Sequence, residues 1–257
     1  MSKSVHKCGR RLRPLAGASV LALVAASGAA AQDDEIIVTA TKRAESIQDV
    51  PLAITAYSAE FVREVNLEDV KDLVTYTPGI TGNSLDSFID FINVRGIVTN
   101  DFGVGGDPSV GFFKNGLYQG RNGAVVTTLY DLDRAEALRG PQGFLFGRNA
   151  IAGAISVHTA RPKLGVVEGY AELDVAERGR VVGEAALNLP LTDKVAVRLA
   201  GYGGKENGYV DNAFDLSADR LVAFNKGAGR FSALYEDGGF NGFLTLEYEK
   251  RNQSPAV

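Results

Sequence analysis

Few side chains in this sequence could carry out covalent or metal chemistry. The 257-residue chain has two histidines, His6 and His158, and a single cysteine, Cys8. A zinc site needs several His or Cys ligands, and a Cys–His catalytic pair needs both residue types together. Because His6 and Cys8 lie in an N-terminal segment expected to be removed, only His158 would remain. The sequence therefore predicts a protein that is not an enzyme and has no metal site or cofactor.

The N-terminal segment has the pattern of a cleaved export signal. Its five basic residues fall within positions 3–13, an apolar run follows over 15–27, and Ala29, Ala30 and Ala31 supply small residues for cleavage before Gln32. The alternative is an N-terminal membrane anchor. Loss of residues 1–31 would leave 22 basic residues against 31 acidic ones. This acidic balance argues against a nucleic-acid partner.

Residues 36–39 offer the hydrogen-bonding chemistry of an extended backbone. Ile36, Ile37, Val38 and Thr39 are all β-branched, which favours a strand, and polar residues flank them. Such a segment could add to the sheet edge of a partner, as in β-augmentation. The alternative is that it forms the first strand of the domain that follows.

Two arginines and a group of glycines suggest a rigid scaffold. Arg95 and Arg139 each follow a predicted strand, where a guanidinium could meet an acidic wall, although both could also be ordinary surface residues. Gly140, Pro141 and Gly143 predict a tight turn directly after Arg139.

The elements that would position these residues fall into two zones after the short N-terminal segment. In the first zone, 45–162, mixed helix and strand signals predict an α+β domain. Ser58 can cap a helix over 59–64, and Asn66 can cap a second helix with an apolar face of Val70, Leu73 and Val74. Thr77, Pro78 and Gly79 end the second helix. Short strands are predicted at 91–94, 110–113, 135–138 and 154–158, with long polar loops at 82–90, 99–108 and 119–124.

The second zone, from about residue 166, alternates apolar and polar residues with period two. The pattern predicts five strands, at 169–175, 181–189, 195–199, 230–236 and 244–249. A soluble sandwich and an outer-membrane barrel share this alternation. Export and the full charges on the polar face, such as Arg198 and Arg230, favour the barrel.

One long motif identifies a family. Residues 133–157 read DRAEALRGPQGFLFGRNAIAGAISV. This stretch closely resembles the plug-domain signature of TonB-dependent outer-membrane receptors. Shorter pieces agree in order and spacing, at 35–40 (EIIVTA), 50–51 (VP), 77–80 (TPGI), 94–97 (VRGI) and 107–111 (DPSVG). The sequence differs from the family pattern at 114–118, Phe144, Phe146 and His158. These differences do not change the expected fold, but they prevent a particular substrate from being assigned by resemblance.

The resemblance implies an α+β plug domain followed by the first antiparallel strands of a transmembrane β-barrel. The expected organisation is a signal peptide (1–31), a TonB-box segment (32–44), a plug domain (45–162) and about five barrel strands (163–257). Receptors of this kind import a scarce nutrient, most often an iron–siderophore complex, across the Gram-negative outer membrane. The implied partners are TonB, outer-membrane lipid and a small-molecule ligand.

The resemblance also implies residue roles. The TonB-binding segment would be Glu35, Ile36, Ile37, Val38, Thr39 and Ala40. Arg95, Glu136 and Arg139 would lock the plug to the barrel through pairs with acids on the barrel wall. Candidate substrate contacts on plug loops are Asp101, Phe102, Tyr118 and Arg121.

The length departs from the family. Plugged transporters use about 22 strands, whereas residues 163–257 suffice for about five at ~10 residues each. We therefore expect an incomplete barrel, from a gene fragment or truncated product that could not transport alone. The alternative from another class is a soluble periplasmic plug-like binding module.

Overall fold

The computed structural model describes residues 36–39, 41–43, 45–82, 92–99, 106–120, 127–211 and 220–254. All of them belong to one compact unit, Ile36–Val257. Several predictions lie outside the described residues: the signal peptide and the site candidates Glu35, Ala40, Asp101, Phe102 and Arg121.

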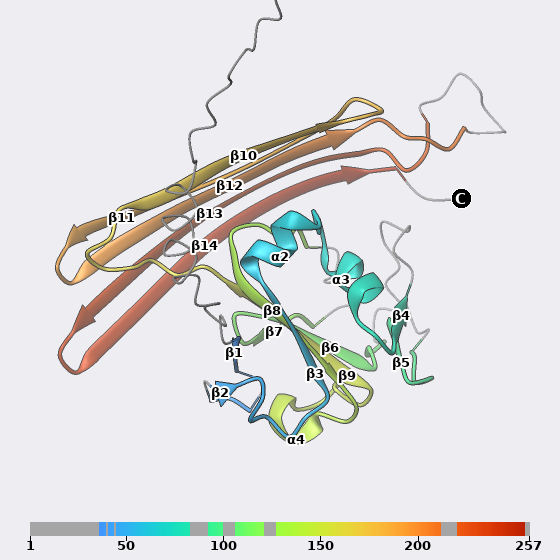
Figure 1. The fold of residues 1–257 in the computed structure, drawn as a ribbon, viewed down its shortest axis with the longest axis horizontal. Coiled ribbons are helices and arrows are strands. Elements are labelled where there is room, and N and C mark those ends of the chain that lie inside the picture. Colours follow the sequence, from blue (N-terminus) through green and yellow to red (C-terminus); the bar gives the residue numbers. More distant parts are fainter. Residues whose placement is uncertain are drawn as a thin grey trace, which may run out of the picture. The chain divides into compact units, whose positions relative to one another are not determined.

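A five-stranded mixed sheet forms the centre of the N-terminal zone, which we call the α+β domain (Figure 1). Its order is β3 (Ile54–Ser58), β8 (Leu132–Arg139), β9 (Gly153–Thr159), β6 (Val110–Lys114) and β7 (Leu117–Tyr118). β6 and β9 run parallel, and the other neighbours are antiparallel. Gly153 permits the close β8–β9 approach, because a Cβ there would lie 2.4 Å from the Leu138 carbonyl oxygen.

Three short helices accompany this sheet: α2 (Ala59–Glu64), α3 (Val70–Tyr76) and α4 (Gly143–Phe146). The Ser58 side chain caps α2 as predicted, accepting a hydrogen bond from Phe61 N at 3.2 Å. The predicted cap at Asn66 was wrong. Asp69 caps α3: its side chain accepts a hydrogen bond from Lys71 N at 2.9 Å, and the Asp72 side chain accepts one from Asp69 N at 3.1 Å. This reciprocal capping box satisfies two otherwise unpaired backbone donors.

The core of the α+β domain lies between α2, α3 and the mixed sheet. As predicted, Val70, Leu73 and Val74 form the inward face of α3 and are buried. The same cluster contains Ile155 and Val157 of β9. Two small antiparallel pairs complete the domain: β1 (Ile37–Val38) with β2 (Glu45–Ser46), and β4 (Ile80–Gly82) with β5 (Ile92–Val94).

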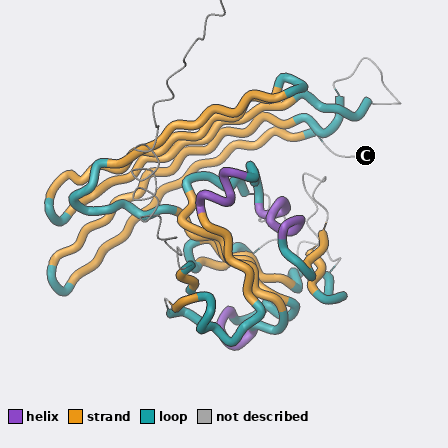
Figure 2. Tube along the Cα trace, in the orientation of Figure 1, coloured by secondary structure: helices purple, strands orange, loops and turns teal. Residues whose placement is uncertain are grey.

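The C-terminal zone is an antiparallel sheet of five strands in sequence order, which we call the long-strand sheet (Figures 1 and 2). The strands are β10 (Glu168–Ala176), β11 (Arg180–Thr192), β12 (Val195–Glu206), β13 (Phe224–Asp237) and β14 (Phe240–Gln253). The five predicted strands are confirmed, and the longest extend well beyond their predicted bounds.

The two faces of the long-strand sheet differ in chemistry. Its apolar side chains are exposed on one face: Leu173, Val175, Leu187, Leu199, Leu244 and Leu246. The opposite face buries polar side chains, including Asn188, Arg198, Arg230 and Ser232. This reverses the rule for soluble proteins. Within the described residues, none of the helices has the length and apolarity needed to cross a membrane.

Candidate interface between the two sheets

A buried carboxylate from the α+β domain lies between two arginines of the long-strand sheet. The Asp131 carboxylate accepts hydrogen bonds from Arg198 at 3.0 Å (Nε) and 2.5 Å (Nη2), and from Arg230 Nη2 at 2.8 Å. All three side chains are at most 7% exposed. Arg230 Nη2 also donates to the Asp131 carbonyl oxygen at 2.8 Å. The two zones are thus joined by charge-assisted bonds, which are about twice as strong as neutral ones.

The backbone at Asp131 is shaped for this contact. Its φ of +47° lies in the left-handed region, which Asp and Asn tolerate better than most residues. This turn directly precedes β8 and directs the Asp131 N–H to Glu184 Oε1 of β11, at 2.8 Å. Asp131 therefore contacts the long-strand sheet through both its side chain and its backbone.

A second acid, Glu68, forms a similar link at the N-terminal side of α3. One oxygen pairs with Arg180 of β11 and the other accepts from Lys226 Nζ of β13 at 2.7 Å. Arg180 also pairs with Glu206 Oε2 at 3.4 Å. In both links the α+β domain supplies the anion and the strands supply the cations.

The last strand, β14, carries both polarities: Arg251 pairs with Asp69 of the α+β domain at 3.6 Å, while two glutamates supply anions. Glu247 of β14 accepts from Lys114 Nζ at 2.7 Å and from the Tyr130 hydroxyl at 2.9 Å. Glu249 accepts from Thr128, at 3.1 Å from the backbone N–H and 2.5 Å from the hydroxyl. Burial, followed by the charge of Glu247, raises the pKa of Tyr130, so this hydroxyl stays protonated and can donate.

Apolar packing contributes a smaller part of the interface. Tyr130 packs with Val182, Ala186, Ala200 and Tyr202, and the two tyrosine rings lie 6.3 Å apart. The other contacts given above are ion pairs and hydrogen bonds from neutral donors to carboxylates. Removing one partner of a buried ion pair would leave a charge uncompensated, which costs more than the intact pair contributes.

The segment from Ile36 to Thr39, which could add to the sheet edge of a partner, is paired within this chain. Ile37 lies opposite Ser46 and Val38 opposite Glu45, in the β1–β2 pair, and Val38 is fully buried. Thr39 N donates to Glu136 Oε1 at 2.8 Å. In this structure the segment is therefore the first strand of the domain, the alternative that periodicity left open.

Glu136 lies in a small cluster inside the α+β domain. Arg134 Nε donates to Glu136 Oε1 at 2.8 Å, and His158 Nε2 lies 3.7 Å from the same oxygen. Burial, with the charge of Arg134, lowers the pKa of His158, so its ring is neutral at pH 7. The contacts of Glu136 in the described part of the chain are thus to Thr39, Arg134 and His158, and not to the long-strand sheet.

The other site candidates lie apart from the interface. Arg139 Nη1 donates to the Pro78 carbonyl oxygen at 2.8 Å, and its buried Nε has no hydrogen-bond partner among the described residues. Arg95 is exposed with a φ of +54° and has no ion pair in the described part of the chain. Tyr118 lies on β7, the edge strand of the mixed sheet, and its hydroxyl accepts from Asn149 Nδ2 at 2.6 Å.

The sequence prediction missed Asp131 and Glu68 as the anions of the interface. The cations were visible, since Arg198 and Arg230 fall on the polar face of predicted strands. Nothing local distinguishes Asp131, because its partners lie 67 and 99 residues further along the chain.

Comparison with known proteins identifies the family of the α+β domain. Residues 46–154 match the family model described as the TonB-dependent receptor plug domain. Among curated proteins, the chain is 28% identical over 201 residues to the ferripyoverdine receptor of Pseudomonas aeruginosa, and 30% identical over 188 residues to the pesticin receptor of Yersinia pestis. These alignments cover 72% and 71% of this chain, but only 24% and 27% of those receptors.

Solved structures show the same fold. The crystal structure of the ferric yersiniabactin uptake receptor from Yersinia pestis matches with a TM-score of 0.70 at 22% identity, covering 78% of this chain and 32% of that one. The pyoverdine outer-membrane receptor of Pseudomonas aeruginosa, bound to pyoverdine, matches with a TM-score of 0.70 at 18% identity, covering 84% and 30%. The long-strand sheet corresponds to strands in the N-terminal part of those barrels.

Proposed function

Because the chain belongs to the TonB-dependent receptors, with its plug domain over residues 46–154, we propose that it serves the import of an iron–siderophore complex across the Gram-negative outer membrane. The chain spans about a quarter of the curated relatives, so import is proposed for an assembly with a complete barrel. No step of this function is a chemical transformation of the nutrient.

The observation that carries the proposal is the two-faced long-strand sheet. Leu187, Leu199 and Leu246 are each more than 40% exposed, on the face away from the plug domain. Arg198 and Arg230 are buried beneath the plug on the other face. Apolar residues facing outward and polar residues facing inward are typical of a strand with lipid on one side and a polar lumen on the other. Outer-membrane lipid is the environment that fits these faces.

TonB is the proposed partner of residues 35–40. The β-branched segment would form backbone hydrogen bonds with a strand of TonB, the β-augmentation mode. Its current partner, β2, forms only two register pairs with it. Tension on the segment would act on the Ile36–Ile47 backbone hydrogen bond and on the Thr39–Glu136 hydrogen bond, and through the second on strand β8 of the mixed sheet.

The remaining predicted roles stay proposals. Arg95 and Arg139 would meet barrel carboxylates, with Glu136 supporting Arg134 behind them. Tyr118, with Asp101, Phe102 and Arg121, would contribute aromatic and charged contacts to the ligand. The relatives named for pyoverdine and yersiniabactin support a ferric siderophore as the ligand class.

Two measurements test the proposal. The first is binding of the periplasmic domain of TonB to the full chain in detergent, comparing Ile37→Pro with Ile37→Thr. Ile37 is 43% exposed, so neither change disturbs the core, but proline removes a ladder donor that threonine keeps. We expect proline to abolish binding and threonine to retain it; equal binding by the two variants would contradict the assignment.

The second measurement is cellular. Deleting the gene should reduce uptake of radioactive iron presented as ferric pyoverdine or ferric yersiniabactin under iron limitation, and the protein should sediment with outer membranes. Undiminished uptake of both complexes, or recovery of the chain in the soluble periplasmic fraction, would instead support the soluble plug-like binding module.

A further inference from the structure

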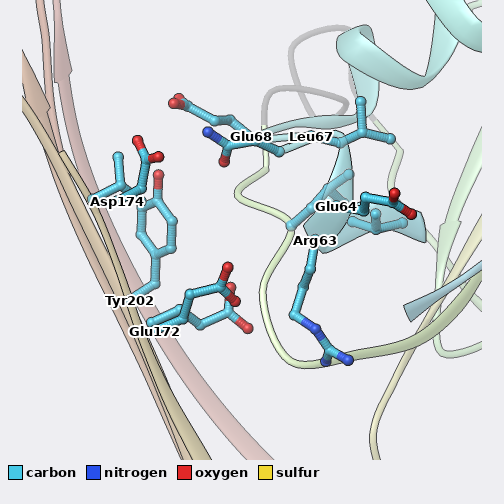
Figure 3. Close-up of a pocket in the computed structure, with 12 residues that line it drawn as sticks. Arg63, Glu64, Leu67, Glu68, Glu172, Asp174 and Tyr202 are labelled. Atoms are coloured by element: carbon cyan, nitrogen blue, oxygen red, sulfur yellow. The ribbon is translucent and has the colours of Figure 1, made fainter. Parts of the chain in front are cut away.

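A cavity of about 220 Å³ lies where α2 and the segment before α3 face strands β10 to β12 (Figure 3). Its wall is strongly acidic. The five carboxylates that line it are Glu64, Glu68, Glu172, Asp174 and Glu184. Arg63 is the one cationic residue in the lining. Its guanidinium lies 3.7 Å from Glu60 Oε1 and 5.1 Å from the Tyr170 ring centre.

Three of the polar groups form a row across the long-strand sheet. Glu172 of β10 lies directly opposite Glu184 of β11, and Glu184 lies directly opposite Tyr202 of β12. Directly opposed residues share one face of a sheet, and their Cβ atoms are about 5 Å apart. Like charges in this position destabilise a sheet. The Glu172–Glu184 pair therefore favours a cation near it.

Among the described residues, no cation forms an ion pair with Glu172 or Glu184. Glu68 and Asp174 are balanced by Arg180, and Glu68 also by Lys226. The two donors that bond to Glu184 in the described part of the chain, the Tyr170 hydroxyl and the Asp131 N–H, are both neutral. In the part of the chain that the structure describes, Glu64 and Glu172 have no ion-pair partner. The cavity thus keeps an excess of negative charge.

Tyr202 provides a second, independent observation. Its side chain lines the cavity and the residue is 7% exposed, yet none of the described residues forms a hydrogen bond with its hydroxyl. A buried hydroxyl without a partner costs about 1–3 kcal/mol relative to a bonded one. Figure 3 shows this hydroxyl on the same side of the cavity as the Asp174 carboxylate. An occupant with N–H donors would satisfy the phenolic oxygen and the carboxylates together.

We propose that this cavity between the plug domain and strands β10 to β12 binds an organic cation carrying an ammonium group, held by Glu172, Glu184 and Tyr202. An ammonium has three donors and no acceptor, which matches a row of two carboxylates and a phenolic oxygen. The site is separate from the TonB segment, and it stands whether or not the protein imports a siderophore.

The geometry favours an ammonium over a metal ion. Among the described residues, no group of three or more Asp, Glu, His or Cys is arranged to hold a metal. The cavity is also roomy for a bare ion, since a water molecule occupies about 30 Å³ in the liquid. An alkylammonium fills more of this volume and tolerates carboxylates that do not converge on one point.

Calorimetric titration of the full chain in detergent with putrescine, a diamine, tests the proposal. We expect saturable binding that Glu172→Gln weakens about tenfold and Tyr202→Phe about threefold, as the loss of a charged and a neutral hydrogen bond predicts. Glu172 is exposed at the cavity mouth, so its substitution spares the fold. Matched controls are Glu177→Gln and Tyr248→Phe, which change exposed residues outside the cavity.

Two further titrations separate the chemistry from general charge effects. Butanediol, which has the length of putrescine without its charge, should not bind. Magnesium chloride at the same concentration should not displace putrescine. Binding unaffected by Glu172→Gln and Tyr202→Phe, equal binding of butanediol, or displacement by magnesium would each overturn the proposal.

Discussion

Replacing Asp131 by asparagine isolates the charge that joins the plug domain to the long-strand sheet. Asparagine has the same shape as aspartate and also tolerates the left-handed backbone, here at φ +47°. The substitution therefore adds no backbone strain. It leaves Arg198 and Arg230 facing a neutral amide in a site where all three side chains are at most 7% exposed.

The size of the loss in stability depends on which ion pairs the two arginines keep after the substitution. Removing one partner of a buried ion pair costs about 3–5 kcal/mol. Arg198 retains Glu168 at 3.3 Å, and Arg230 retains Glu247 at 3.8 Å, so each cation keeps a longer contact to another anion. We therefore expect a loss near the lower limit, about 3 kcal/mol in the free energy of unfolding.

Urea titration of the full chain in detergent, followed by tyrosine fluorescence, measures this loss. The chain has nine tyrosines and no tryptophan, and Tyr130 and Tyr202 lie on opposite sides of the interface. The matched control is Asp133→Asn, whose carboxylate is 56% exposed and pairs with Arg134; it should cost about 1 kcal/mol or less. Equal losses for the two variants would refute the view that Asp131 anchors the interface.

Three further predictions concern other parts of the chain. Burial, reinforced by Asp69, raises the pKa of Asp72 to about 6. The native state therefore binds the proton more tightly than the unfolded state, and stability should fall as pH rises from 4 to 6. The urea midpoint of the Asp72→Asn variant should not show this fall; a variant with the same pH profile as the unsubstituted protein would contradict the prediction. Gly153→Ala should lower the thermal midpoint, because its Cβ would lie 2.4 Å from a backbone oxygen, whereas Gly143→Ala, with no atom within 4 Å, should not; equal midpoints would count against the close β8–β9 approach. Leu246→Lys should reduce insertion into lipid vesicles while Leu246→Met does not, since a lysine at the bilayer midplane costs about 2–4 kcal/mol; equal insertion would argue against a lipid-facing position.

The sequence predicted those elements whose signals are local. Period-two alternation is repeated five times after residue 166, and each repeat became a long strand. Ser58 and Asp69 are equally good capping residues by type, as is Asn66. Both positions are also followed by an aspartate three residues later, Asn66 by Asp69 and Asp69 by Asp72, so the local pattern alone did not decide between them. In the structure Asn66 has a left-handed backbone, with φ +53°, whereas Asp69 is extended and forms the capping box with Asp72.

The interface was harder to predict, because its partners are distant in sequence. Arg198 could be assigned to a polar face, but its partner could not be identified among 31 acidic residues. The family resemblance directed attention to arginines of the plug. In the five strands present, the principal buried pairs have the opposite polarity, with Asp131 and Glu68 as plug anions.

The composition of the plug core has a consequence for the order of folding. Every residue of that core cluster lies between Tyr57 and Val157, and β10 begins only at Glu168. Because domains generally fold as units, the plug can complete its core without any residue of the long strands. Asp131 and Glu68 would then already be in place for pairing with Arg180, Arg198 and Arg230. The plug would thus act as an intramolecular chaperone, a charged template against which the strands are set in register.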